Sequence, residues 1–208
     1  MAIPQSTHYI HWNYFLNLEQ DLIVLSRYIE FSEKNYETYS QELAKVFLAA
    51  SSEFDVVLKQ ICIIKGLNKS RPNIDDYRNT ITSNLPLLCQ EIVFIDRYGM
   101  ELEPLERWYN TSDKNPLWWT DYNTVKHNRN EGYMKANLKN TLNSMAALAL
   151  VNLYFHYFTF AQERQMAMSE VFRHLKSEPD LISFNQDYHA TFKMGPEINI
   201  NLEMGPEI

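Results

Sequence analysis

The sequence predicts a mainly α-helical bundle of five to six helices with one small β-hairpin inserted. Only 5 of the 208 residues are glycine, so the chain has few of the residues that interrupt helices. Long segments carry apolar residues at spacings of three and four, the period of a helix with one buried face. Hydrophobic residues make up 45% of the chain and charged residues 22%, as is ordinary for a globular protein.

The N-terminal part of the chain predicts two long helices. The first covers His11–Phe31, and its apolar stripe contains Ile10, Tyr14, Leu18, Leu22, Leu25 and Ile29. A polar break at Ser32–Asn35 separates it from a second helix over Tyr36–Lys65. Gly66 follows directly and is a favourable residue at which to end that helix.

A third helix is expected to begin after Asn73, whose side chain can cap the first free backbone amides. Asp75 and Asp76 lie in the first turn, where the helix dipole favours negative charge. The helix should end near Leu85, because Pro86 cannot continue it.

A β-hairpin is predicted at about residues 91–105. Two short apolar segments, Glu91–Asp96 and Met100–Leu105, flank the turn sequence Arg97–Gly99. Apolar runs of this length on both sides of a glycine-containing turn are typical of a hairpin.

The C-terminal half predicts a short helix and then a long one. The polar loop Asn110–Pro116 precedes a short helix over Leu117–His127. A second break at Arg129–Gly132 is followed by a long helix over Ala136–Ala161. Residues 162–176 either extend this helix or form a sixth.

We therefore expect a single helical domain over residues 1–176 and an extended C-terminal tail over residues 177–208. The tail contains the sequence MGPEI at 194–198 and again at 204–208, a period of ten. A proline in each copy rules out a helix through the repeat. The tail could add a strand to the domain or to a neighbouring protein chain, and an unstructured or processed tail is an equal alternative.

Charge and cysteine usage limit the kinds of partner and compartment. The net charge is −7 and the sequence pI is about 5.4, which argues against broad, nonspecific binding of nucleic acid. A local basic pocket built from Lys126 and Arg129 remains compatible with this balance. Cys62 and Cys89 lie in apolar contexts without metal-site spacing, which indicates buried thiols in a reducing, cytoplasmic compartment.

No targeting or membrane segment is expected. The N-terminus lacks a basic region followed by an apolar run. The most apolar stretch, 142–161, contains five polar residues, so a buried core helix is favoured over a membrane span. His156 in this stretch is predicted to be a buried histidine of the core.

The segment Trp118–Arg129 concentrates hydrogen-bonding and titratable side chains. In a helix, Asn123, Lys126 and His127 share one face. His127 is the candidate for proton transfer, because an unperturbed histidine titrates near neutrality. Trp118 and Trp119 are adjacent, so we expect one in the core and the other at the rim, as an apolar wall beside this face. An ordinary polar surface with a hydrogen-bonded histidine is the alternative.

Other chemical motifs are missing or incomplete. The sequences typical of phosphate loops, dinucleotide sites, zinc proteases and nucleophile elbows do not occur. His8 and His11 have a spacing that can meet one metal ion, but no further ligands are apparent. We therefore expect neither a metal nor a cofactor.

The helical order, and the motif Tyr122–Arg129 (YNTVKHNR) ahead of a long apolar helix, resemble the HEPN superfamily over about residues 10–165. The resemblance implies a small helical bundle, often an RNase or nucleotide-binding module of toxin–antitoxin, antiphage or RNA-processing systems. His127 matches the family's catalytic histidine, and Asn123 matches its polar position. The arginine that precedes this histidine in the family is absent, and Thr120–Tyr122 occupy its place.

The resemblance implies three alternative functions. The first is a non-catalytic module that binds RNA or a nucleotide, or acts as a scaffold, which the missing arginine favours. The second is a metal-independent endoribonuclease with His127 as acid and base. Its substrate would contact Tyr122, Trp119 and three further residues, Asn123, Lys126 and Arg129. The third is a helical protein–protein interaction module without a pocket. Family sites are commonly built across a two-fold axis, so the resemblance also implies a homodimer.

Overall fold

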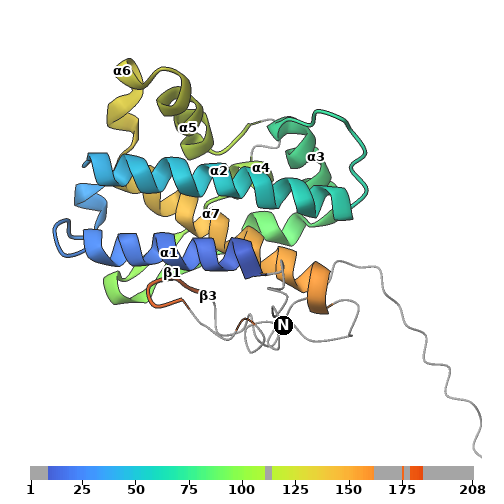
Figure 1. Cartoon of the computed structure of the whole chain (residues 1–208), viewed down its shortest axis with the longest axis horizontal. Coiled ribbons are helices and arrows are strands. Elements are labelled where there is room, and N and C mark those ends of the chain that lie inside the picture. The colour runs from blue at the N-terminus through green and yellow to red at the C-terminus, as the bar shows by residue number, and fades with distance from the viewer. Residues whose placement is uncertain (1–8, 111–113, 162–174, 176–178, 185–208) are drawn as a thin grey trace, which may run out of the picture.

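The computed structural model describes residues 9–110, 114–161, 175 and 179–184. These residues form a mainly helical bundle with a small three-stranded sheet, which confirms the expected fold class at this level. The helices α1 (Ile10–Leu25) and α2 (Gln41–Ile64) run side by side, and α7 (Leu138–His156) crosses behind them (Figure 1). The helices α5 (Leu117–His127) and α6 (Arg129–Gly132) lie on the side of α2 opposite α1 (Figure 1).

Most of the predicted helices occur, with some shifted ends. The bounds predicted for α5 are confirmed. The first helix ends at Leu25 rather than Phe31, although Phe31 is buried, because an apolar residue can reach the core from a turn. The second begins at Gln41 rather than Tyr36, because the Ser40 hydroxyl accepts a hydrogen bond from the Leu43 amide (3.1 Å) and caps the helix there.

Two short helices and several tight turns were not predicted. The helix α4 (Glu106–Asn110) follows the hairpin, and α6 lies where we expected only a break. A π-helical turn at Tyr157–Ala161 continues α7, so the regular helix is shorter than the predicted Ala136–Ala161. Tight 3₁₀ turns lie at Glu33–Asn35, Pro86–Gln90, Asp96–Tyr98 and Tyr133–Lys135.

The core is built around α7, which is buried on almost every side. Small side chains such as Ala146, Ala147 and Ala149 let the neighbouring helices approach it closely. Two of its buried polar residues donate to carbonyls of the same helix: Ser144 Oγ to Thr141 (2.9 Å) and Asn152 Nδ2 to Leu148 (3.0 Å). No helix among the described residues is long and apolar enough to cross a membrane.

The predicted core residues His156, Cys62 and Cys89 are buried, which confirms their expected positions. The His156 ring stacks on Tyr9 with centroids 5.9 Å apart and meets the edge of Trp12. Burial raises the pKa of both thiols to about 12, and both cysteines are free. They are therefore inert apolar residues of the core at neutral pH.

The hairpin expected at residues 91–105 is confirmed by β1 (Val93–Ile95) and β2 (Met100–Leu102), which pair antiparallel. The turn between them needs Gly99, because its φ of +59° is left-handed. A third strand, β3 (Ser183–Phe184), pairs with the other edge of β1, giving the order β2-β1-β3. Part of the predicted tail thus adds a strand to the body of the protein.

Two expectations for the C-terminal region lie largely outside the described residues. The sixth helix over residues 162–176 is one of them, although Leu175 is described and is helical and buried. The MGPEI repeat is the other. A domain boundary at residue 176 stays a prediction.

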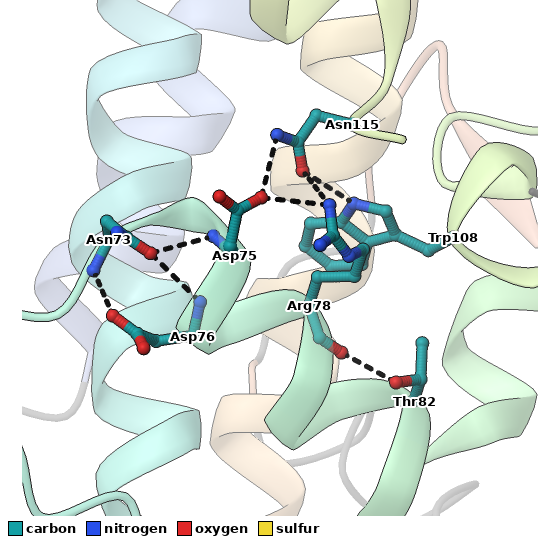
Figure 2. Close-up of polar contacts among 7 residues, drawn as sticks. All are labelled: Asn73, Asp75, Asp76, Arg78, Thr82, Trp108 and Asn115. Carbon is teal, nitrogen blue, oxygen red and sulfur yellow. Dashed lines mark hydrogen bonds and ion pairs between the residues drawn. The ribbon is translucent and has the colours of Figure 1, made fainter. Parts of the chain in front are cut away.

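The third helix, α3 (Ile74–Asn84), begins at Asn73 as predicted. The Asn73 side chain accepts hydrogen bonds from the amides of Asp75 and Asp76, and the Asp76 carboxylate accepts one from the Asn73 amide (Figure 2). This reciprocal capping box satisfies backbone donors that the first helical turn leaves free.

A polar cluster then ties α3 to the segment before α5. Arg78 Nη1 donates to Asp75 Oδ1 (2.9 Å) and to Asn115 Oδ1 (3.2 Å), and Asn115 in turn donates to Asp75 (Figure 2). Trp108 Nε1 lies 3.4 Å from the same Asn115 oxygen. Most of these polar atoms bond to one another, which favours a structural role, although Arg78 Nε is buried without a hydrogen-bond partner among the described residues.

Replacing Asn73 with alanine should lower the free energy of unfolding by about 1 kcal/mol, because the cap is lost while the fold is kept. The exposed Asn79 lies within the same helix, so Asn79→Ala is the matched control and should change stability by less than about 0.5 kcal/mol. Urea unfolding followed by circular dichroism measures both. Equal effects of the two substitutions would contradict the capping role.

Candidate functional site

The helix that carries the predicted site residues is anchored by its two tryptophans. Trp118 is 3% exposed and Trp119 8%, and both rings contact Phe54 of α2. Trp118 Nε1 also donates to the Pro104 carbonyl (2.8 Å). The expectation that one tryptophan lies at the rim was therefore wrong. The reason is that α5 packs against both α2 and α7, so that adjacent positions are both buried.

Tyr122 is also part of this buried side of α5. Its ring lies between Trp119 and Phe47, with centroids 5.2 Å and 6.3 Å away. Lys126 Nζ lies 5.2 Å from the centroid of the Tyr122 ring, within the range of a cation–π contact. Tyr122 and Trp119 are thus buried, and the Tyr122 ring contacts the Lys126 side chain. Neither aromatic ring has a face open to solvent.

Asn123 makes a local contact. Its Nδ2 donates to the Trp119 carbonyl one turn earlier (3.0 Å), and the side chain is half-buried. This bond directs the amide group along the surface of its own helix. Asn123 therefore lies next to the exposed end of α5 but does not reach beyond it.

The basic side chains at the end of α5 are exposed. Lys126, His127 and Arg129 all face solvent. Within the described residues, neither the His127 nor the Arg129 side chain makes a hydrogen bond or an ion pair. We call these three residues the α5 basic end. Lys126 and His127 lie in the last turn of α5, where the helix dipole favours positive charge, and Arg129 is the first residue of α6.

Lys126 lies near a carboxylate of α2 that we did not predict, Asp55. Burial raises the pKa of Asp55, while the charges of Lys126 and Lys59 act in the opposite direction. Burial also raises the pKa of Tyr77 to about 12, with a smaller contribution from Asp55. Asp55 and Lys59 are four residues apart in a helix, which is the only signal of this pair in the sequence.

The position of α5 relative to α7 is fixed by Asp121. Its carboxylate accepts a hydrogen bond from Lys135 Nζ (2.6 Å) and another from Asn140 Nδ2 (2.9 Å). Asn140 Nδ2 also donates to the Lys135 carbonyl (2.8 Å). Asp121 thus joins α5 to the turn Tyr133–Lys135 and to the first turn of α7, which gives its carboxylate a structural role.

Gly132, the last residue of α6, lies directly against Thr124 of α5. A Cβ atom at this position would lie 2.8 Å from Thr124 Cγ2 and 3.2 Å from the Thr124 backbone. The Gly132 amide donates to the Asn128 carbonyl (2.9 Å), which closes the short helix against the end of α5. This close approach sets the position of Arg129 relative to His127.

A small cavity of about 90 Å³ lies elsewhere, between α4, α5 and the start of α7. It is lined by Glu103, Pro104, Glu106, Arg107, Pro116, Leu117, Trp118, Lys139, Asn140 and Asn143. Ligand pockets usually enclose about 300–1,000 Å³, so this cavity is too small for a nucleotide. None of Lys126, His127 or Arg129 lines it, so the predicted residues do not share this cleft.

A second titratable group lies beside the sheet. Tyr154 of α7 donates its hydroxyl to Glu91 Oε1 (3.0 Å), and burial raises the pKa of Glu91 to about 7, against the effect of this bond. Glu91 precedes β1, far along the chain from the α5 basic end. The described residues contain no group of three or more side chains suited to a metal ion.

Comparison of the chain with protein-family models, with curated proteins and with solved structures finds no match.

Replacing Gly132 with alanine should destabilise the protein by about 1–3 kcal/mol, because the new methyl group meets both the side chain and the backbone of Thr124. Asn130→Ala, an exposed position in the same short helix, is the control and should be nearly neutral. Thermal unfolding of the two variants measures the difference. A Gly132→Ala protein as stable as the control would show that α6 can move away without cost.

The raised pKa of Glu91 predicts that stability falls as pH rises through about 7. Above that pH the folded protein must hold a buried charge that costs nothing in the unfolded chain, where the carboxyl already ionises near 4.5. Glu91→Gln keeps an acceptor for Tyr154 and should remove this loss. The melting temperatures of both proteins at pH 5.5 and pH 8.5 test it, and parallel pH dependences would contradict it.

Proposed function

We propose that this chain is a non-catalytic, HEPN-like helical module that binds the phosphates of RNA or of a nucleotide through the α5 basic end. The supporting observation is that three cationic or titratable side chains are exposed to solvent close together in the chain: Lys126 and His127 in the last turn of α5, and Arg129 at the start of α6. Surface contacts from cationic side chains are how proteins usually hold phosphate, and they need no enclosed cleft.

The same exposure favours binding over catalysis. A proton-transfer site needs a held geometry and exclusion of water, because electrostatic stabilisation is weak in an open aqueous surface. Within the described residues, no side chain orients His127 by a hydrogen bond. The arginine that the HEPN resemblance implies before this histidine is also absent. One of the residues in its place, Asp121, carries a negative charge and bonds to Lys135.

An interaction module is the second candidate, and one observation favours it. Three large apolar side chains near α5 are more than half exposed, and they belong to Tyr109, Leu117 and Met134. Such side chains can contribute the central contacts of a protein interface. A homodimer with α5 near its two-fold axis, in a cytoplasmic toxin–antitoxin or antiphage system, is the setting that we propose for either function.

The proposed function predicts weak, salt-dependent binding of single-stranded RNA. Each phosphate contact contributes about 0.7 to the slope of log affinity against log salt. The triple variant Lys126→Ala, His127→Ala, Arg129→Ala should therefore lose affinity and about 1.4 in slope, counting one contact each for the two permanently charged side chains, Lys126 and Arg129. The control removes two exposed cations elsewhere, with Lys34→Ala and Arg71→Ala. Fluorescence anisotropy of labelled 12-nucleotide RNA and of labelled ATP, at 50 and 200 mM salt, measures this.

Three outcomes separate the candidates. Binding that is lost in the triple variant but kept in the control supports the proposed function. Equal binding by all three proteins contradicts a role for the α5 basic end and leaves the interaction module. Cleavage of the RNA in the presence of EDTA, lost in His127→Ala, would show instead a metal-independent endoribonuclease.

A further inference from the structure

A fully buried carboxylate holds the C-terminal segment against the body of the protein. Glu19 of α1 is 0% exposed, and it accepts hydrogen bonds from three consecutive backbone amides. Its Oε2 lies 2.9 Å from the Asp180 nitrogen, and its Oε1 lies 3.0 Å and 2.8 Å from those of Leu181 and Ile182. Successive amides that converge on one anion form a concave anion-binding nest.

The burial of this carboxylate has a physical cost. Burial raises the pKa of Glu19, and the three amides partly offset that effect. A buried charge without donors is strongly unfavourable, so Glu19 requires an occupant that supplies several backbone amides in a row. The backbone bends at Asp180 and Leu181, which turns the three amides toward one point. A segment without proline that makes the same bend supplies these amides whatever its side chains are.

Side-chain contacts on both sides of the nest add selectivity. Gln20 Nε2 donates to Asp180 Oδ2 (2.9 Å), and Ser183 Oγ bonds to Asp96. Leu181 and Ile182 are 6% and 2% exposed, so both side chains lie in the core. The segment then pairs with the edge of β1, with Val93 opposite Phe184. The segment therefore has the order acidic, aliphatic, aliphatic, hydroxyl, aromatic. Its acidic residue bonds to Gln20, its two aliphatic residues lie in the core, its hydroxyl bonds to Asp96, and its aromatic residue pairs with β1.

We propose that Glu19, Gln20, Asp96 and the edge of β1 form a peptide-binding groove of the strand-addition type. Its occupant in this structure is the chain's own segment Asp180–Phe184, which we call the resident segment. The partner is a protein that presents an extended segment of the same chemistry, with an acidic residue, two aliphatic residues, a hydroxyl and an aromatic residue. This inference does not depend on the proposed binding of RNA.

Exchange requires that the resident segment can leave without unfolding of the whole protein. Its strand has only two residues and lies at the edge of the sheet, so release breaks that short ladder, the three amide bonds to Glu19 and the packing of Leu181 and Ile182, but no bond within a helix. We therefore expect the amides of Leu181 and Ile182 in the wild-type protein to exchange hydrogen at least 100-fold faster than the amides in the middle of α7. Equal rates would show that the segment opens only on global unfolding, and would overturn the proposal.

Binding in trans is tested with a labelled peptide of residues 179–184, with the sequence PDLISF. The full chain carrying Ile182→Asp should release its resident segment and bind this peptide at least tenfold more tightly than wild type does. Ile182→Val keeps the resident segment and is the matched control. A peptide with Asp in place of the isoleucine should not bind, and adding Glu19→Ala to the Ile182→Asp chain should abolish binding.

The outcomes are measured by fluorescence anisotropy, with far-ultraviolet circular dichroism as the check on folding. If Ile182→Asp loses its helical spectrum, the milder Leu181→Ser variant replaces it. Failure of a folded variant to bind the peptide, or equal binding of the peptide with and without Glu19, would overturn the groove.

Discussion

The burial of α7 on nearly all sides is the constraint on which the other elements depend. A helix that exposes almost no surface must be covered by several neighbours, and α1, α2 and α5 each take one side of it. Its alanines keep those neighbours close, and Ser144 and Asn152 donate hydrogen bonds to carbonyls of the helix itself. The surface helices consequently have little freedom to move relative to one another.

This constraint explains why α5 ends in a basic surface instead of a cleft. With Trp118, Trp119, Tyr122 and Val125 all buried, the polar positions of the helix are left only a narrow side and its C-terminal end. Lys126, His127 and Arg129 lie at that end and face outward. A helix held so firmly is a good platform for contacts with a large anionic partner, and a poor one for enclosing a small substrate.

Local signals in the sequence predicted the elements well. The bounds of α5 follow from Pro116 before it and the break after it, and the start of α3 follows from the capping residue Asn73. The end of α1 was less predictable, because Phe31 continues the apolar pattern from a turn and not from a helix. The periodicity of apolar residues predicts which side chains are buried. It does not by itself show where the helical backbone ends, because a residue in the following turn, such as Phe31, can be buried too.

The candidate site was less predictable, because its decisive contacts join distant parts of the chain. Both tryptophan rings contact Phe54 of α2, and the charge of Lys126 acts on Asp55 of the same helix. The three amides bound by Glu19 lie more than 150 residues away along the chain. Neither spacing nor composition contains such pairings.

The high pKa of Cys62 and Cys89 has a practical consequence. Both thiols are buried and protonated at neutral pH, so a cysteine introduced at exposed Asn130 can be labelled selectively with a thiol-reactive spin label or dye, without removal of either native cysteine.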